Sequence, residues 1–455
     1  MSSPEPGPAW PRHRTLLLLA LACFALEAAA LTRYGWFRDE FYYLACADHP
    51  ALGYVDQPPL SIWLLAGWRA LFGESLAALR LLPAFVGAAT VYLTGALAAA
   101  LGGSRPAQAI AAVAALATPT LLGTFHYCSM NSFDLLLWLV AFHLWVRALE
   151  TGSSGDWLKL GSVLGLGLLD KISVLWLLAG IAGGLLLTSH RRQLARPGPW
   201  LGAGLALALF SPYVLWNAAH HWPTLEFMRN ATVRKMVATG PLEFWQRQLL
   251  TMNPANALVW LPGLAWLLFD HDGKRWRPLG LAFAIVAGIL MLGGRSRASY
   301  LAPAYLALFA AGGVALERRL TGPRGAWARG AVVVLVVGLG AVSAPLALPL
   351  LPVERFIAYS RSLGLAPGTE EHHRMGPLPQ QYADMFGWPE LVDEVANAWA
   401  SLTPEERTHA AIFGQNYGEA GAVEVLGRAR GLRPVLSGHN NFWLWGPPVG
   451  RSACS

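Results

Sequence analysis

Apolar stretches, each close to the length needed to cross a lipid bilayer, recur along most of this chain. A membrane-spanning helix needs about 20 largely apolar residues. Eleven segments fit this description, at residues 15–32, 81–101, 107–123, 133–149, 157–169, 172–189, 199–217, 255–269, 279–293, 300–316 and 330–350. Hydrophobic residues make up 55% of the 455 residues and charged residues only 13%, against about 25% charged in soluble domains. The pattern predicts a polytopic α-helical membrane protein with about 11 transmembrane helices.

The pair 157–169 and 172–189 allows two interpretations. As one helix, it would place Asp170 and Lys171 near the middle of the membrane, where each charge costs about 2.5–3.5 kcal/mol on insertion scales. As two helices, it places both charges in the turn between them. We therefore favour two helices, although the first segment is short for a span.

The charges of the loops agree with this choice. With eleven spans, loops 190–198, 270–278 and 317–329 share a side with the N-terminus and hold ten basic residues in 31 positions. The opposite loops, 218–253 and 294–299, hold six in 42. Because basic residues concentrate in cytoplasmic loops, we predict a cytoplasmic N-terminus and an external C-terminus in a bacterial inner membrane.

The composition becomes mixed and polar after the last span. We predict a transmembrane domain at 1–350, whose segment 33–80 is an extracytoplasmic loop with interfacial helices, and a small α/β extracytoplasmic domain at 351–455. Thr403 and Glu406 have the spacing of a helix capping box. Residues 411–414 and 442–446 are predicted to be short strands.

The loop after the first span carries the first candidate for chemistry. Asp39 and Glu40 stand among aromatic residues that include Tyr42 and Tyr43. Aromatic side chains gather at headgroup depth, and burial there makes a carboxylate more basic, as a general base requires. The alternative is an interfacial charge without a catalytic role.

Three further polar positions are expected on the same external side. Asp56 and Gln57 precede two prolines that fix a rigid turn, and their alternative role is a turn hydrogen bond. Asp134 opens the span at 133–149, where a role at the helix start is the alternative. Lys171 either faces a phosphate group or forms an ion pair with Asp170 in the turn.

Basic residues in external loops oppose the general trend. They are Arg229, Arg234, Lys235, Arg295 and Arg297. Anionic lipid headgroups would explain cations on this side, and arginine suits two-pronged contacts with phosphate. Solvated loop charge is the alternative. With 34 scattered basic residues in the whole chain, nucleic acid is not an expected partner.

The order of these motifs resembles a known family. A first span that runs into Arg38-Asp39-Glu40, then Tyr54 with the Asp56-Gln57-Pro58-Pro59 turn, then Asp134 at a later span, is similar to the bacterial branch of glycosyltransferase family 39. These are dolichyl-phosphate-mannose–protein mannosyltransferase-like proteins, related to the lipid A aminoarabinose transferases. The latter carry Glu-Lys-Pro-Pro at this turn, so the lysine is missing here, which weakens the case for a lipid A acceptor.

The resemblance implies a GT-C fold and an integral membrane glycosyltransferase. The enzyme would move a sugar from a polyprenyl-phosphate donor to an acceptor hydroxyl at the external face, with inversion. Asp39 matches the acid thought to activate the acceptor, Glu40 its neighbour, and Asp134 an acid close to the same site. The candidate substrate-binding residues are Tyr42, Tyr43, Asp56, Gln57, Asp134, Lys171, Arg295 and Arg297. A divalent metal is a candidate cofactor, with Asp39 and Asp134 as candidate ligands.

The acceptor stays open among a lipid, a glycan and a protein, and other functions compete. A transporter or flippase for a lipid-linked glycan would move the donor without breaking its glycosidic bond. A non-catalytic assembly protein would use the C-terminal domain to bind its partners. Covalent transfer distinguishes the enzyme from both alternatives.

Overall fold

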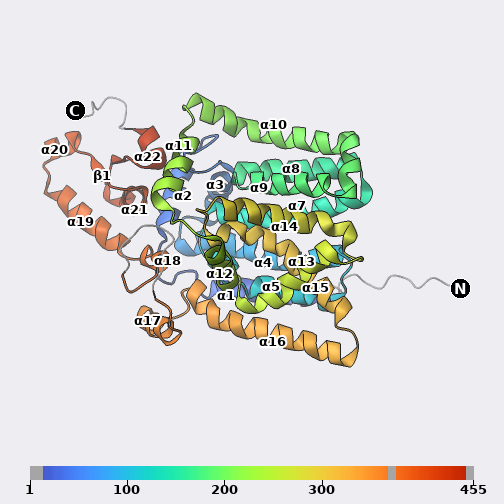
Figure 1. The fold of residues 1–455 in the computed structure, drawn as a ribbon. Helices are drawn as coiled ribbons and strands as arrows, with labels where there is room; N and C mark the ends of the chain where they lie inside the picture. The colour runs from blue at the N-terminus through green and yellow to red at the C-terminus, as the bar shows by residue number, and fades with distance from the viewer. Residues whose placement is uncertain (1–13, 367–375, 447–455) are drawn as a thin grey trace.

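The computed structural model describes residues 14–366 and 376–446, and for residues 234 and 235 only the backbone. Within these ranges the chain is almost entirely helical. Most helices run side by side in one bundle, and the C-terminal elements gather at one end of it, near α2 (Arg38–Asp48) and α11 (Pro223–Asn230) (Figure 1). This arrangement confirms a polytopic helical membrane architecture with a small C-terminal segment.

Six helices are long and apolar enough to cross a membrane, and two bent pairs raise the number to eight. The six are α4 (Leu76–Ala100), α7 (Met130–Thr151), α10 (Pro197–Ala219), η5–α14 (Lys274–Leu292), η6–α15 (Ala298–Arg319) and α16 (Gly322–Ala347). The pairs are α5 (Arg105–Leu116) with α6 (Pro119–Phe125), and α9 (Val174–Leu186) with η2 (Ser189–Ala195).

The predicted number of eleven is therefore not confirmed, although each predicted segment contains a helix. The remaining three helices are α1 (Arg14–Ala28), α8 (Ser154–Asp170) and α13 (Ala257–Phe269), with 15, 17 and 13 residues. At 1.5 Å per residue, they measure about 20–25 Å, which is less than the roughly 30 Å of a bilayer core.

The uncertain pair at 157–189 consists of two helices, as expected. Helix α8 ends at Asp170 and α9 begins at Val174. The turn between them brings the end of α8 to the same end of the bundle as the start of α7, since the Lys171 ammonium donates to Asn131 Oδ1 at 2.8 Å. Asp170 and Lys171 thus lie at a helix end and not inside one continuous span.

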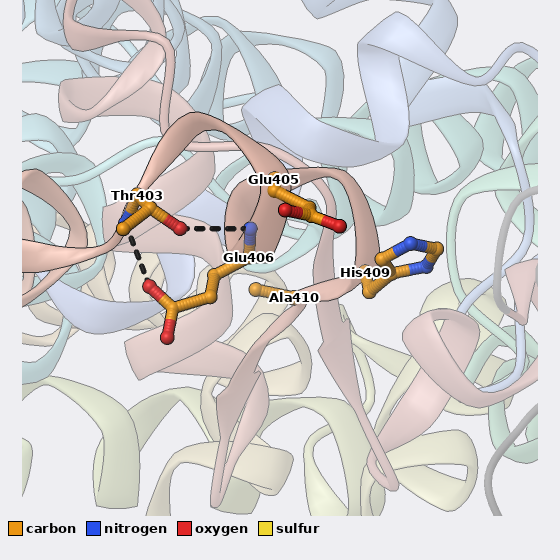
Figure 2. Close-up of a pocket in the computed structure, with 5 residues that line it drawn as sticks. All are labelled: Thr403, Glu405, Glu406, His409 and Ala410. Carbon is orange, nitrogen blue, oxygen red and sulfur yellow. Dashed lines mark hydrogen bonds between the residues drawn. The ribbon is translucent and has the colours of Figure 1, made fainter.

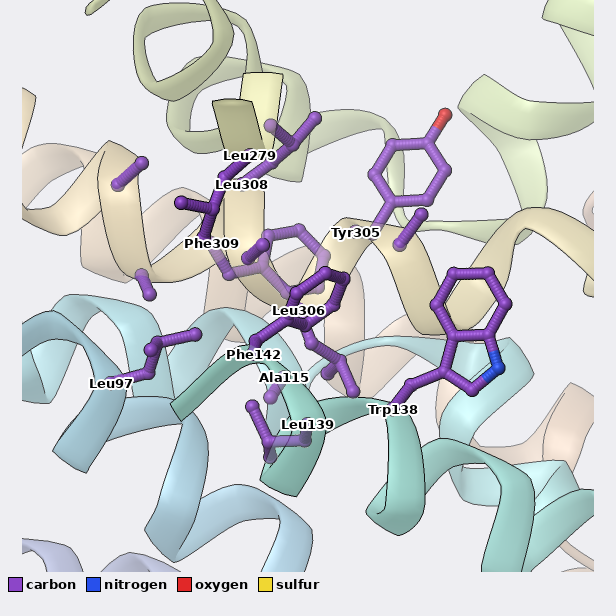
Figure 3. Packing of buried hydrophobic residues seen from close by; sticks show 14 of the residues in the cluster. Leu97, Ala115, Trp138, Leu139, Phe142, Leu279, Tyr305, Leu306, Leu308 and Phe309 are labelled. Atoms are coloured by element: carbon purple, nitrogen blue, oxygen red, sulfur yellow. The ribbon is translucent and has the colours of Figure 1, made fainter. Parts of the chain in front are cut away.

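The core of the bundle surrounds α15. Figure 3 shows Leu306 and Phe309 of this helix packed toward Leu139 and Phe142 of α7. The Tyr305 ring instead contacts the rings of Trp260 and Phe283. Helix α13 approaches α15 so closely that a Cβ atom at Gly312 would lie 2.1 Å from the Val259 carbonyl oxygen. A glycine at this crossing lets two backbones meet, which is typical of helix packing in membranes.

Shorter helices connect the bundle to its polar end. They are α3 (Leu60–Phe72), η3 (Ala231–Lys235), α12 (Pro241–Thr251) and η4 (Pro254–Asn256). The C-terminal elements are α17 (Val353–Ser362), α18 (Gln380–Ala383), α19 (Trp388–Ser401), α20 (Pro404–His409), β1 (Ile412–Gly414), α21 (Tyr417–Leu426), η7 (Arg428–Arg430), β2 (Val435–Ser437) and α22 (Asn440–Trp445).

The C-terminal segment contains the expected capping box and one of the two expected strands. The Thr403 hydroxyl accepts from the Glu406 amide at 3.3 Å, and the Glu406 carboxylate accepts from the Thr403 amide at 2.7 Å (Figure 2). The strand at 411–414 is present as β1, which pairs in parallel with β2. Only a two-stranded sheet results.

The strand predicted at 442–446 is wrong, because these residues belong to α22. Phe442 and Trp445 are three residues apart and therefore share one helix face. Their ring centroids lie 4.9 Å apart, and Phe442 is buried against α2, with its ring 6.3 Å from that of Tyr42. Apolar packing at helical spacing outweighs the strand preference of the aromatic residues.

Candidate active site

Helix α2 opens with three charged residues, Arg38, Asp39 and Glu40, whose side chains have different surroundings. The helix starts at Arg38, and the Glu40 carboxylate reaches back to accept from the Phe37 amide at 2.8 Å. An acid at the third helical position commonly closes a helix start in this way. Because Asp39 and Glu40 are adjacent on a helix, they face different directions, and the structure gives them different roles.

Glu40 is fully buried and held by Arg80 of α4. The Arg80 Nε and Nη2 atoms donate to its two carboxylate oxygens at 3.0 and 2.9 Å, and the Cys128 amide adds a third contact at 3.3 Å. Arg80 also donates to the Leu31 and Gly35 carbonyl oxygens. With its oxygens engaged, Glu40 fixes the start of α2, and its geometry does not support contact with a substrate.

Asp39 is the accessible acid of the pair, with 34% of its side chain exposed. The Tyr417 hydroxyl donates to Asp39 Oδ1 at 2.7 Å, and Arg38 Nε lies 3.5 Å from the same oxygen. Within the described part of the chain, no hydrogen bond reaches Oδ2. One carboxylate oxygen is thus fixed and the other is available to accept a proton.

Tyr127 shows which charges surround Asp39. Burial raises the pKa of the Tyr127 phenol to about 12, and the negative charge of Asp39 adds to this effect. The guanidinium of Arg297 lowers the same pKa. Asp39 and Arg297 therefore act on one phenol, although 258 positions separate them in the sequence. The expected carboxylate and cation lie in one neighbourhood.

Asp134 and Lys171 form a buried pair beside this neighbourhood. The Lys171 ammonium donates to Asp134 Oδ2 at 3.2 Å, and the Ser173 hydroxyl lies 3.1 Å from both Asp134 oxygens. Helix α7 begins at Met130 with Ser129 as its cap, so Asp134 lies in the second turn and does not open the helix. The alternative ion pair of Lys171 with Asp170 is wrong, since the partner of Lys171 is Asp134, and its contact with a phosphate stays a prediction.

The C-terminal segment also fixes the turn that carries Asp56. The Tyr42 hydroxyl donates to Asp56 Oδ1 at 2.7 Å and accepts from the Asn441 amide at 3.3 Å. Asn441 Oδ1 in turn accepts from the Val55 amide at 2.7 Å. Asn441, nearly 400 positions away in the sequence, therefore links Tyr42 to the turn that carries Asp56.

Gln57 and Tyr43 differ in how their polar atoms are used. Gln57 is fully buried, and its side-chain amide has no hydrogen-bond partner among the described residues. The Tyr43 hydroxyl accepts from the Met130 amide at 3.0 Å and so holds the start of α7. Tyr43 is buried, which indicates a structural contribution to the site.

The arginines at 295 and 297 have different surroundings. Arg295 is exposed and donates to the carbonyl oxygens of Thr232 and Val233 at 3.1 and 3.2 Å, which fastens η3 to the loop before η6. Arg297 is half-buried, and its charge acts on Tyr127. Of the two, Arg297 is the better candidate for contact with a phosphate. The side chains of Arg234 and Lys235 lie outside the described residues.

Metal ligands do not converge at this site. In residues 14–366 and 376–446, no three His, Cys, Asp or Glu side chains form a group that could hold a metal ion. The two candidate ligands have other partners, Tyr417 for Asp39 and Lys171 for Asp134. The described residues of this site do not favour a metal centre.

Sequence reasoning missed Arg80 and Tyr417. A signal existed for Arg80, since a charge beside an apolar span usually has a buried partner. No local pattern marked Tyr417, because its importance comes from a contact with Asp39 in a distant part of the chain.

Comparison with known proteins gives one family match. Residues 56–216 match the family model described as dolichyl-phosphate-mannose-protein mannosyltransferase. The matched range contains Asp56, Gln57, Asp134 and Lys171 and ends before the arginines at 295 and 297.

Curated relatives are distant. The undecaprenyl phosphate-alpha-4-amino-4-deoxy-L-arabinose arabinosyl transferase of Pseudomonas savastanoi is 28% identical over 207 residues, which are 44% of this chain and 38% of the relative. The undecaprenyl phosphate-alpha-4-amino-4-deoxy-L-arabinose arabinosyl transferase 2 of Pseudomonas fluorescens is 26% identical over 371 residues. These are 74% of this chain and 61% of the relative. The chain thus matches less than two thirds of the length of either.

Solved structures extend the likeness to most of the chain. ArnT from Cupriavidus metallidurans has a TM-score of 0.63 in the apo state, at 15% identity, over 93% of this chain and 84% of ArnT. ArnT with undecaprenyl phosphate bound gives a TM-score of 0.60 at 16% identity, over 94% of this chain and 86% of ArnT. The Archaeoglobus fulgidus oligosaccharyltransferase gives a TM-score of 0.55 at 14% identity, over 88% of this chain and 60% of that one. The likeness seen in the sequence is confirmed: the chain has a GT-C-like fold that matches ArnT, has distant similarity to the aminoarabinose transferases, and matches the dolichyl-phosphate-mannose-protein mannosyltransferase family model at residues 56–216.

Proposed function

We propose that this protein is an integral membrane glycosyltransferase that takes a sugar from a polyprenyl-phosphate donor and passes it to an acceptor hydroxyl. The observation that carries the proposal is the partly exposed Asp39 carboxylate, in which Tyr417 fixes one oxygen and the other has no hydrogen bond among the described residues. The charges of Asp39 and Arg297 both act on Tyr127. The names of the curated relatives and the undecaprenyl phosphate bound to ArnT support the donor class.

The reaction follows from these two charges. The acceptor oxygen attacks the anomeric carbon, and its proton passes to Asp39 Oδ2, which acts as general base. The bond between the anomeric carbon and the phosphate oxygen breaks, and polyprenyl phosphate leaves with the bonding electron pair. Attack from the face opposite the phosphate inverts the anomeric carbon. The leaving group gains negative charge, which the Arg297 guanidinium stabilises.

The surrounding residues prepare the site for this step. Glu40 and Arg80 fix the helix that carries Asp39, and Lys171 holds the Asp134 carboxylate in place. We assign Asp56, Gln57 and Tyr42 to the binding of substrate hydroxyls, next to the C-terminal segment. The loop charges favour an external position of the site, where a lipid, a glycan or a protein hydroxyl would be the acceptor.

The test measures polyprenyl phosphate released by purified protein in nanodiscs. The protein is incubated with a panel of undecaprenyl-phosphate sugars and a membrane extract as acceptor, and products are detected by mass spectrometry. We expect release by the wild type and a loss of about 10²–10⁴-fold in Asp39→Asn, the usual contribution of a general base. The matched control is Asp393→Asn. It removes a surface carboxylate of α19 that pairs with Arg430 of η7.

Two outcomes contradict the proposal. Full turnover in Asp39→Asn would remove Asp39 as the base. Movement of an intact donor across the membrane by wild type, without release of polyprenyl phosphate from any donor, would identify a transporter of lipid-linked sugars instead.

A further inference from the structure

We infer that Tyr417 of the C-terminal segment is a positioning residue for Asp39, so that the active site is complete only when α21 is docked on α2. This inference rests on the proposed function and assigns the C-terminal segment a part in the transfer step. The Tyr417 hydroxyl would hold Asp39 Oδ1 and turn Oδ2 toward the acceptor hydroxyl.

The main contact joins residues that are 378 positions apart. The Tyr417 hydroxyl donates to Asp39 Oδ1 at 2.7 Å, a short distance typical of a hydroxyl that donates to a carboxylate. The same oxygen has Arg38 Nε at 3.5 Å. Both contacts fall on one oxygen, which fixes the rotation of the carboxylate.

The phenol ring of Tyr417 is itself held on two sides. The guanidinium of Arg38 lies 5.3 Å from its centroid, within the range of a cation–π contact. The ring of Tyr42 lies 5.3 Å away on a tilted plane. Arg38 also forms an ion pair with Asp384 at 3.2 Å, so a second residue of the C-terminal segment contributes to the same support.

Two glycines allow α21 to lie directly on α2. A Cβ atom at Gly418 would lie 2.3 Å from Arg38 Cγ, and one at Gly421 would lie 3.0 Å from Phe41 Cβ. The start of α21 is capped by Asn416 Oδ1, which accepts from the Gly418 and Glu419 amides at 2.9 and 3.1 Å. The backbone that carries Tyr417 is therefore fixed against the helix that carries Asp39.

The hydroxyl keeps its proton under ordinary conditions. Burial raises the pKa of Tyr417 well above the usual range of a phenol, and the charge of Asp39 adds to the effect. The side chain is therefore a hydrogen-bond donor across the pH range in which the enzyme would work. A donor at a carboxylate favours the charged, proton-accepting form of that carboxylate.

Tyr417→Phe removes this donor and keeps the ring. We expect kcat to fall about 10- to 100-fold, the scale of a hydrogen bond to a charged group, with the KM for donor unchanged. We also expect a change in the dependence of kcat/KM on pH. Its acidic limb should move to higher pH, because the uncharged form of Asp39 becomes easier to populate. A purely structural role for Tyr417 would not move this limb.

Two variants complete the test in the full-length protein with the undecaprenyl-phosphate sugar that the wild type uses. Tyr359→Phe makes the same chemical change on α17, where the hydroxyl donates to the Val342 carbonyl at 2.6 Å, and should leave both kcat and the profile unchanged. Gly418→Ala keeps the Tyr417 hydroxyl but forces α21 away from Arg38, and should reproduce the shift of the acidic limb.

The outcomes separate this inference from the proposed function. If Asp39→Asn is inactive while Tyr417→Phe has wild-type kcat and an unmoved acidic limb, the inference is wrong and the function stands. If Asp39→Asn retains full turnover, the general-base assignment itself fails. A lower kcat with an unmoved limb, together with a lowered melting temperature, would show that Tyr417 only stabilises the fold.

Discussion

Arg80 and Glu40 form an ion pair in which both side chains are completely buried, joined by hydrogen bonds of 3.0 and 2.9 Å. The pair links α4 of the bundle to the first turn of α2, the helix that carries Asp39. A residue in the membrane-embedded framework thus determines where the proposed catalytic acid lies.

We predict that removal of either partner destabilises the protein strongly. Arg80→Met leaves the Glu40 carboxylate buried without its partner, a change that typically costs about 3–5 kcal/mol. Thermal unfolding in detergent should show a large drop in melting temperature. Asp39→Asn is the control and should melt close to wild type, because its side chain is partly exposed. A stable Arg80→Met variant would contradict the framework role.

The contrast between Asp39 and Glu40 shows what could be predicted from the sequence. The pattern of acids and aromatic residues directed attention to the start of α2, and it predicted a catalytic role for both acids. Which of them faces solvent depends on Arg80, which follows about 40 positions later in α4, and on the rotation of α2. Neither can be obtained from local sequence.

Other differences have similar causes. The eleven apolar segments were identified correctly as helix-containing, but their lengths follow from tertiary packing that ends α8 at Asp170 and α13 at Phe269. The partner of Lys171 was expected next to it in the chain and is instead Asp134, on a neighbouring helix. The capping box at Thr403 was predictable because all its atoms lie within four consecutive residues.

Lys171 and Asp134 should behave as a coupled pair. Lys171→Met alone leaves the buried Asp134 carboxylate without its cation, and Asp134→Asn alone leaves the ammonium without its anion. The double variant removes both charges and should lose less stability than the sum of the two single variants, with a coupling free energy of about 0.5–3 kcal/mol. Unfolding free energies of the four proteins measure this quantity, and strict additivity would show that the 3.2 Å contact contributes nothing.

Thr403→Ala should destabilise α20 locally. The substitution removes the side chain that caps the Glu406 amide, a loss of typically about 1 kcal/mol. Hydrogen exchange should become faster in residues 404–409 and stay unchanged in α21. Glycosyl transfer should not change, since α20 lies at the outer edge of the C-terminal segment (Figure 1). Unchanged exchange in α20 would show that its helix start is held by other contacts.

Acid should loosen the contact between the C-terminal segment and α3. Asp48, at the end of α2, forms ion pairs with Arg69 of α3 and with Arg428 of η7. Burial alone would raise the pKa of Asp48, but these two guanidinium groups together hold it below its usual range. A lowered pKa in the folded state means that the stabilisation is present above the unfolded value, near about 3.9. It is lost as the pH falls through the lower, folded value.

Hydrogen exchange of η7 and α21 measured between pH 6 and pH 3 tests this prediction. In the wild type, protection from exchange should be constant near pH 6. It should decrease once the pH is lower than about 4, where aspartate takes up its proton. Asp48→Asn lacks the titrating group, so it should be less protected at pH 6 and should lose less protection on acidification. Equal acid dependence in both proteins would assign the effect to other carboxylates of the C-terminal segment and would remove Asp48 as the acid-sensitive link.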